Sequence, residues 1–280
     1  MAIELFDNGR HKCLMFEDLV TCSRPYKNNT EEDVCHTIQS NQFLIVDSGH
    51  AALLDPGGNL TYNRLFVSVS QHVTIRELDY VIASHQDPDI VGSLNKWLIG
   101  SNCNVIVPKL WERFVPHFCS PGATDGRLYG IPDEGLEIEI GNSVLVAVPA
   151  HFLHSEGNFH FYDPISKILF TGDVGASHVE NSALSMPVKD FAQHIPRMQS
   201  FHQRYMNANK VCRLWANMVR TLDVEWIVPQ HGPSFKGKAM VKQFLDWFQD
   251  LPCGVDLMQQ INYRTGGVSR LSLKHHAATA

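Results

Sequence analysis

The chain has 280 residues, 44% of them hydrophobic, so it can bury one large core or two small ones. Its 23 Lys and Arg residues against 29 Asp and Glu residues give a net charge of −6, which argues against bulk nucleic-acid binding or adhesion to anionic lipid. The start is charged where a secretory signal needs an apolar run, and no stretch approaches the roughly 18 apolar residues of a membrane span, so we expect a cytoplasmic protein without membrane contact.

The first half of the chain alternates predicted strands and helices. Two apolar runs around the turn Asp47-Ser48-Gly49 predict a β-hairpin over residues 41–58. Further along we expect a helix, a strand, a helix and a strand over residues 60–73, 78–84, 90–100 and 102–108. The last three form a βαβ unit, so the polar turn that follows the strand should lie at the carboxyl edge of a sheet, where α/β folds bind ligands.

The second half is rich in predicted strands. Two are expected within residues 136–150, two within 159–173 and a last one over 223–232, ending at His231. Residues 188–223 lack turn signals after Pro196 and predict one or two helices.

The chain shows no feature that divides it into several domains. We find no repeat, low-complexity tract or Pro/Ser linker, so we expect one domain over residues 1–262 and a partly disordered tail over residues 263–280. The seven cysteines are widely spread without a C-x-x-C pair, and we expect reduced, mostly buried thiols.

A short cluster of polar residues follows each of four predicted strands. Singly, a His after a strand is more often a loop residue than a ligand, but the four clusters together predict a metal centre. Their candidate ligands are His85, Asp87, Asp89, His154, Asp173 and His231. A dinuclear centre needs about six protein donors, and Asp173 from a separate strand suits a bridge because its two oxygens can bind different ions.

The segment His85-Gln-Asp87-Pro-Asp89 resembles the H-x-[HED]-x-D signature of the metallo-β-lactamase superfamily. Within it the chain resembles the iron branch, which comprises the diiron domain of flavodiiron proteins and the stand-alone oxygen-binding diiron proteins. This likeness covers most of the chain and implies an α/β fold, the αβ/βα four-layer sandwich. It also implies that one ion binds His85, Asp87, His154 and Asp173, and the other Asp89, Asp173 and His231. His154 is preferred to His151 because L-H-S-E-G-N-F matches the family's L-H-x-x-x-x-F.

The second position of the signature indicates the metal. Zinc hydrolases of this fold have His there, whereas this chain has the carboxylate Asp87. The added charge and hard oxygen donors suit iron or manganese better than zinc. We therefore expect two Fe ions, with Mn or Zn as alternatives.

Three further side chains are expected to line the ligand pocket. His178 stands five residues after Asp173, as in the D-x-F-G-x-H segment of flavodiiron proteins, and Tyr205 resembles the first Tyr of their Tyr-Tyr-Ala segment. His194, Met198 and His202 share one helical face, from which His202 is the candidate for the pocket.

The sequence departs from the family pattern at Ile90, where a His ligand is usual. Three outcomes follow. In the first, the second ion has an open position for water, O₂ or substrate. In the second, His178 or His202 supplies the missing ligand. In the third, the second site binds its metal ion weakly.

The resemblance implies a diiron protein that binds, and in flavodiiron proteins reduces, O₂ or another small diatomic ligand. Only 49 residues follow His231, fewer than a flavodoxin-like domain of roughly 150, so no FMN is expected in this chain and a separate electron donor or signalling partner would be needed. The same resemblance is a weaker basis for expecting a homodimer.

The alternative function is that of a dinuclear hydrolase acting on a phosphodiester such as a cyclic dinucleotide, with His178, His202 and Arg204 contacting phosphate. In a third interpretation the metals are purely structural.

Overall fold

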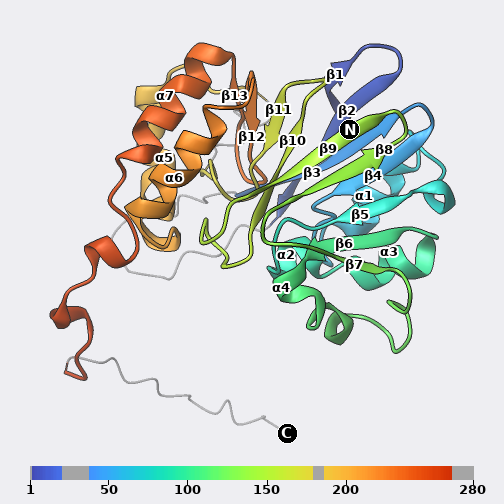
Figure 1. Ribbon diagram of the computed structural model, residues 1–280, viewed down its shortest axis with the longest axis horizontal. Helices are drawn as coiled ribbons and strands as arrows, with labels where there is room; N and C mark the ends of the chain where they lie inside the picture. The colour runs from blue at the N-terminus through green and yellow to red at the C-terminus, as the bar shows by residue number, and fades with distance from the viewer. Residues whose placement is uncertain (1, 21–37, 179–185, 267–280) are drawn as a thin grey trace, which may run out of the picture.

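Two β-sheets lie face to face at the centre of the molecule (Figure 1). The computed structural model describes residues 2–20, 38–178 and 186–266. The first sheet has the strand order β1 to β7, which are Ala2–Asp7, His11–Val20, Ile38–Asp47, His50–Leu54, Tyr80–Ile82, Asn104–Pro108 and Leu128–Ile131. The second sheet has the order β13 to β8, where β8 to β13 are Leu136–Ile140, Ser143–Pro149, Phe159–Asp163, Ile168–Phe170, Trp226–Val228 and Phe235–Lys236.

The helices cover the outer faces of both sheets. Helices α1 to α4 are Tyr62–Val69, Pro88–Val91, Leu94–Gly100 and Lys109–Glu112, and α5 to α7 are Phe191–Tyr205, Asn209–Val219 and Lys238–Gln249. Short 3₁₀ turns η1 to η4 span Ile75–Glu77, Val115–Phe118, Val255–Leu257 and Gln260–Asn262. Figure 1 shows α5, α6 and α7 beside the second sheet, with α1 and α3 beside the first.

Apolar side chains fill three spaces between these layers. Along β3, Phe43 and Ile45 enter the core between the sheets, while Leu44 enters the core shared with α1 and α3. This alternation follows from the two-residue period of a strand. A third core packs the second sheet against α5, α6 and α7, and α6 contributes Cys212, Trp215, Ala216 and Val219 at helical spacing. Three interlayer cores make four layers, so the expected αβ/βα sandwich is confirmed.

The predicted elements are largely present. The hairpin is β3–β4, where Asp47 pairs with His50 and Ser48 and Gly49 both have positive φ, at 52° and 88°. That conformation matches the twist of hairpin strands. The βαβ unit is also confirmed, because β5 and β6 pair in parallel.

Two predicted elements end differently. The helix expected over residues 90–100 is divided into α2 and α3, because the backbone N–H of Ser93 donates to the Gly57 carbonyl at 3.2 Å. The last parallel strand, β12, ends at Val228 rather than at His231, since Pro229 offers no N–H and the N–H of Gln230 donates to Gly172 O at 2.7 Å.

Two further expectations concern membrane spans and the C-terminal tail. Among the described residues, no helix is both long and apolar enough to cross a bilayer. Most of the tail expected over residues 263–280 lies outside the described residues, which end at 266, so the division into a domain and a tail stays a prediction.

Candidate metal centre

Loops that leave both sheets bring the predicted ligands to one edge of the sandwich. His85 and Asp87 follow β5, His154 follows β9, Asp173 follows β11 and His231 follows β12. Because β4, β5 and β6 are mutually parallel, as are β11 and β12, their carboxyl ends meet at this edge.

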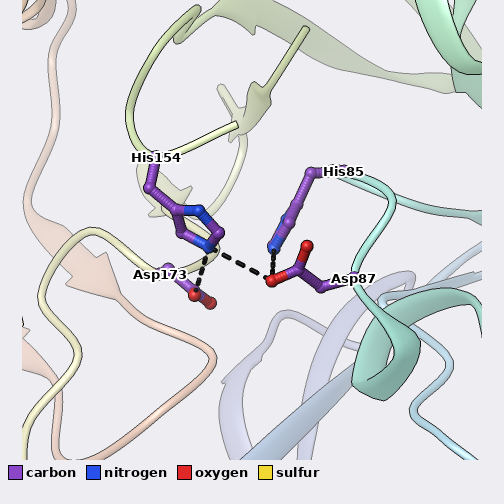
Figure 2. Close-up of side chains that lie close together, drawn as sticks. All are labelled: His85, Asp87, His154 and Asp173. Carbon is purple, nitrogen blue, oxygen red and sulfur yellow. Dashed lines mark hydrogen bonds and ion pairs between the residues drawn. The ribbon is translucent and has the colours of Figure 1, made fainter. Parts of the chain in front are cut away.

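Four of the predicted ligands form one tight cluster, drawn in Figure 2. The donor atoms of His85, Asp87, His154 and Asp173 all lie within 4.8 Å of one another. His154 Nε2 lies 2.9 Å from Asp173 Oδ2 and 3.4 Å from Asp87 Oδ2, and His85 Nε2 lies 3.8 Å from Asp87 Oδ2. These separations suit side chains that share one cation.

Asp173 also faces the remaining predicted ligands. Its second oxygen, Oδ1, lies 3.5 Å from His231 Nε2, and that nitrogen lies 3.2 Å from Asp89 Oδ2. The two oxygens of Asp173 are therefore directed at different histidines, one in each half of the site. This arrangement is the one that a bridging carboxylate needs.

The charges of the site are strongly coupled. Burial opposes protonation of His154, yet the hydrogen bonds and charges of Asp173 and Asp87 outweigh it and raise its pKa to about 10. Burial likewise opposes protonation of His231, whose pKa rises to about 9 beside Asp173 and Asp89. The pKa of Asp173 falls well below its usual range despite burial, because of the His231 charge and the His154 hydrogen bond. The carboxylates thus favour positive charge at this position, which a bound cation would supply.

Two buried atoms in the cluster show that the residues fit a metal. Among the described residues, His85 Nε2 and Asp173 Oδ1 are inaccessible to solvent and make no hydrogen bond. Buried polar atoms are rarely left without a partner, since desolvation costs roughly 1–3 kcal/mol. Metal coordination at both atoms would remove that cost.

The opposite ring nitrogens of two ligands are held by the fold. His231 Nδ1 lies 2.9 Å from the Gln39 carbonyl, so it donates and leaves Nε2 for a metal. His85 Nδ1 lies 2.9 Å from the Ser84 hydroxyl, and the Ser84 N–H donates to Asp55 Oδ1 at 2.8 Å. Burial raises the Asp55 pKa to about 6, although the His85 charge opposes the shift.

Sequence reasoning missed these supporting groups. Asp55 precedes Pro56-Gly57-Gly58, a signal that could have been noticed, but Gln39 acts through its backbone carbonyl and leaves no trace in the sequence. Gly232 has φ of +87°, and a Cβ there would lie 2.3 Å from Ser177 Oγ, so only Gly lets the His231 loop pack so closely.

Two cavities border the Asp89 and His231 side of the site. The smaller, of about 150 Å³, is lined by Asp89, Ala176, Ser177, His178, Phe201 and His231. The larger, of about 580 Å³, also contacts Asp89 and His231 and extends to Leu60 and Phe118. The structure thus places His178 on a small cavity beside the second half of the site.

Tyr205 lies near the first half of the site. Its ring stands 5.6 Å from that of His154 in a T-shaped arrangement and stacks on Phe201 at 4.6 Å. The Tyr205 side chain is also 54% exposed, so it covers one side of His154 at the protein surface.

His202 and His194 are not brought to the cavities. His202 is fully buried, accepts a hydrogen bond from Gly175 N–H at 2.9 Å and donates from Nδ1 to Met198 O at 2.7 Å. Both nitrogens are therefore occupied, and His202 has none left for a metal or ligand. His194 Nε2 lies 3.1 Å from Ser177 Oγ, and burial, with the Arg197 charge, lowers its pKa to about 4.

Ile90 and His151 also lie apart from the cluster. Ile90 has no exposed surface and packs in the core between the first sheet and its helices. His151 Nε2 lies 2.9 Å from the Asp133 carbonyl, so His154 is the histidine of this loop that reaches the site.

This four-layer sandwich, with His and Asp side chains gathered at one edge, defines the metallo-β-lactamase class of metal-binding proteins. A model described as "ODP family beta lactamase" matches residues 38–232, more than half of the chain, and the chain belongs to that family. The predicted resemblance to the superfamily and its flavodiiron-like branch is confirmed.

Solved structures support the same assignment. The chain is 32% identical to "Peroxy diiron species of chemotaxis sensor ODP", with a TM-score of 0.78, 93% of this chain covered and 99% of that chain. It is 33% identical to the apo state of chemotaxis sensor ODP from T. denticola, with the same TM-score, 93% of this chain and 98% of that one. The rubredoxin oxygen:oxidoreductase of Desulfovibrio gigas shares the fold at 14% identity, with a TM-score of 0.74, 89% of this chain and 61% of that chain.

Curated relatives are longer than this chain. An uncharacterized protein of Methanocaldococcus jannaschii is 26% identical over 218 residues, which are 74% of this chain and 52% of that protein. Diflavin flavoprotein A 1 of Synechocystis is 24% identical over 209 residues, 71% of this chain and 33% of that protein. The match thus spans about half the length of the first relative and a third of the second.

Proposed function

We propose that this chain is a non-haem diiron protein that binds O₂ and acts as an oxygen sensor. The observation that carries the proposal is the position of Asp173 between His154 and His231, with one carboxylate oxygen directed at each. Support comes from the 32% identity, over 93% of the chain, to a chemotaxis sensor whose structure is described as a peroxy diiron species.

In this proposal six side chains hold the two ions. His85, Asp87 and His154 would hold one ion and Asp89 and His231 the other, with one oxygen of Asp173 available to each. The set combines three imidazoles with three carboxylates, and the hard carboxylate oxygens suit iron or manganese better than zinc. When bound, two ferrous ions would supply the reducing electrons that O₂ binding requires.

The surrounding residues would control access to the metals. His178 lines the cavity of about 150 Å³ beside Asp89 and His231, and we assign to it contact with the small ligand. Ile90 lies in the apolar core and offers no donor, so of the predicted ligands only Asp89, Asp173 and His231 would hold the ion beside this cavity. We assign to Tyr205, which covers His154, the shielding of the other ion from solvent.

The phosphodiesterase alternative is not favoured. It assigned the phosphate contacts to His178, His202 and Arg204, but His202 is buried and hydrogen-bonded through both nitrogens. The two solved structures that are about one third identical to this chain are described as a chemotaxis sensor, one of them as its peroxy diiron species, and not as a hydrolase.

The test is metal loading followed by exposure to O₂. Protein loaded anaerobically with ferrous iron should hold two equivalents, and O₂ should generate a new visible absorption band that is absent under nitrogen. The matched control is Asp223→Ala, which removes an exposed carboxylate that precedes β12, whereas His231 follows the other end of that strand, and it should leave the band unchanged. Stoichiometric zinc without iron after iron-supplemented expression, or no spectral response to O₂, would overturn the proposal.

A further inference from the structure

A second cluster of metal-binding side chains lies at the opposite edge of the sandwich. Asp47 at the end of β3 pairs with His11 on one side and with His50, the first residue of β4, on the other. His85 instead follows the end of β5, which runs parallel to β4, so the two clusters are separated by the length of the strands.

Three donor atoms of this cluster converge, from His11 and Cys13 on β2 and Asp163 at the end of β10. His11 Nε2 lies 2.8 Å and Cys13 Sγ 3.2 Å from Asp163 Oδ2, and His11 Nε2 and Cys13 Sγ are 3.6 Å apart. His11 and Cys13 are two residues apart on one strand, so both point into the space between the sheets. The cluster therefore joins the first sheet to the second.

The cluster is buried and crowded at a single oxygen. His11, Cys13 and Asp163 are each at most 1% exposed. Four groups lie within 3.4 Å of Asp163 Oδ2, namely His11 Nε2, Cys13 Sγ, and the hydroxyl and backbone N–H of Ser166. Each of these groups can donate a hydrogen bond to this oxygen, so its negative charge is the point on which the cluster converges, and a cation could take the place of the His11 and Cys13 protons there.

A second layer of contacts orients the imidazole. His11 Nδ1 lies 3.3 Å from Asp47 Oδ1, and Asp47 Oδ2 accepts a hydrogen bond from Asn142 N–H at 2.8 Å. Arg10 Nε lies 3.6 Å from the same carboxylate and balances its charge at the surface. A carboxylate that fixes the far nitrogen of a His is the usual support of a zinc-bound imidazole.

We propose that His11, Cys13 and Asp163 bind a divalent zinc ion that ties the two sheets together, with the Ser166 hydroxyl beside the fourth position. Imidazole, thiolate and carboxylate form the mixed nitrogen, sulfur and oxygen set that zinc accepts, at bond lengths of about 2.0–2.3 Å. Donors 2.8–3.6 Å apart can reach those lengths through small side-chain shifts. On binding, the Cys13 thiol proton and the proton that His11 Nε2 directs at Asp163 pass to solvent, while Nδ1–H keeps its contact with Asp47. The turn at residues 164–167, next to Asp163, is partly exposed.

Cobalt(II) substitution tests the proposal, because thiolate coordination gives a near-ultraviolet charge-transfer band that a site of His and Asp alone cannot give. Full-length, iron-loaded protein should bind one further equivalent of Co²⁺ with this band, and Zn²⁺ should displace it. Cys13→Ser should abolish the band, whereas Cys103→Ser, which removes a buried thiol elsewhere, should retain it. Asp47→Asn should weaken binding roughly 10–100-fold by freeing the imidazole.

The outcome is separable from that of the diiron proposal. Asp173→Ala should lose the irons but keep the thiolate band, since Asp173 lies at the other edge. If Cys13→Ser does not fold, the wild-type titration decides alone. Absence of a thiolate band at one added equivalent of Co²⁺, or a band that persists in folded Cys13→Ser, would overturn the proposed zinc site.

Discussion

The backbone N–H of Gly175, which stands two residues after the bridging candidate Asp173, donates a 2.9 Å hydrogen bond to Nε2 of His202. Burial lowers the pKa of His202 to about 4, so the ring is neutral and can accept this bond. Its other nitrogen donates to Met198 O within α5. The contact fixes the Asp173 loop against the helix, and His202 is therefore a positioning residue.

We expect His202→Leu to destabilise the protein without removing a ligand. The substitution leaves the buried Gly175 N–H unpaired, which costs about 1–3 kcal/mol in the free energy of unfolding. Urea unfolding measures that loss, and metal analysis of the folded variant should still give two ions. His117→Leu, at an exposed His, is the control and should change neither quantity. Loss of one ion with unchanged stability would make His202 a ligand instead.

A second prediction concerns acid stability and His160. Burial, reinforced by the His85 charge, lowers the His160 pKa from 6.5 to about 3, so the folded protein keeps this ring neutral. Stability from a depressed pKa is present above the unfolded pKa of 6.5 and is lost as pH falls towards 3. At pH 5 the loss from this one group should be about 2 kcal/mol.

The measurement compares unfolding free energies of wild type and His160→Gln from pH 7 to pH 5. Glutamine does not titrate, so the variant should lose less stability over this interval, although it starts lower because its packing against Trp215 changes. His117→Gln should follow the wild-type curve. Parallel curves for wild type and His160→Gln would show that His160 does not contribute to the acid sensitivity.

Restoring the family's histidine at position 90 should not add a ligand. Ile90 is fully buried in the core beneath the first sheet, and an imidazole without a partner there costs about 1–3 kcal/mol. We therefore expect Ile90→His to lower the free energy of unfolding and to leave the iron spectrum unchanged. The control is Ile90→Val, which keeps the position apolar and therefore measures the stability lost through altered packing alone. An altered iron spectrum at undiminished stability would mean that the new side chain turns towards Asp89.

The meeting of these His and Asp side chains at one edge could be predicted because each follows the end of a strand within a few residues. His85 follows an apolar run and Asp173 follows another, and strand ends at the carboxyl edge of a parallel sheet meet in space. His202 could not be placed in the same way. Helical spacing puts it on one face with Met198, but does not say whether that face meets a cavity or, as observed, the apolar core.

Contacts between residues far apart in the sequence also could not be predicted from local sequence patterns. Cys13 and Asp163 lie 150 positions apart, and no local pattern joins them until β2 and β10 face each other. The break between α2 and α3 has the same cause, since it depends on the Gly57 carbonyl accepting from Ser93 N–H. Local periodicity predicts elements, whereas their ends depend on partners supplied by the assembled fold.

The proposed bridging role of Asp173 makes the sharpest prediction for the metal centre. If its two oxygens bind different ions, Asp173→Ala removes a ligand from both, and the variant should retain neither iron at full occupancy. Asp89→Ala should instead affect only the ion at His231, because the Asp89 carboxylate pairs with that histidine. Iron content and Mössbauer spectra of the two variants measure this difference. One ion retained at full occupancy in Asp173→Ala would show that this carboxylate serves a single metal, and the site would then be two independent centres rather than one coupled pair.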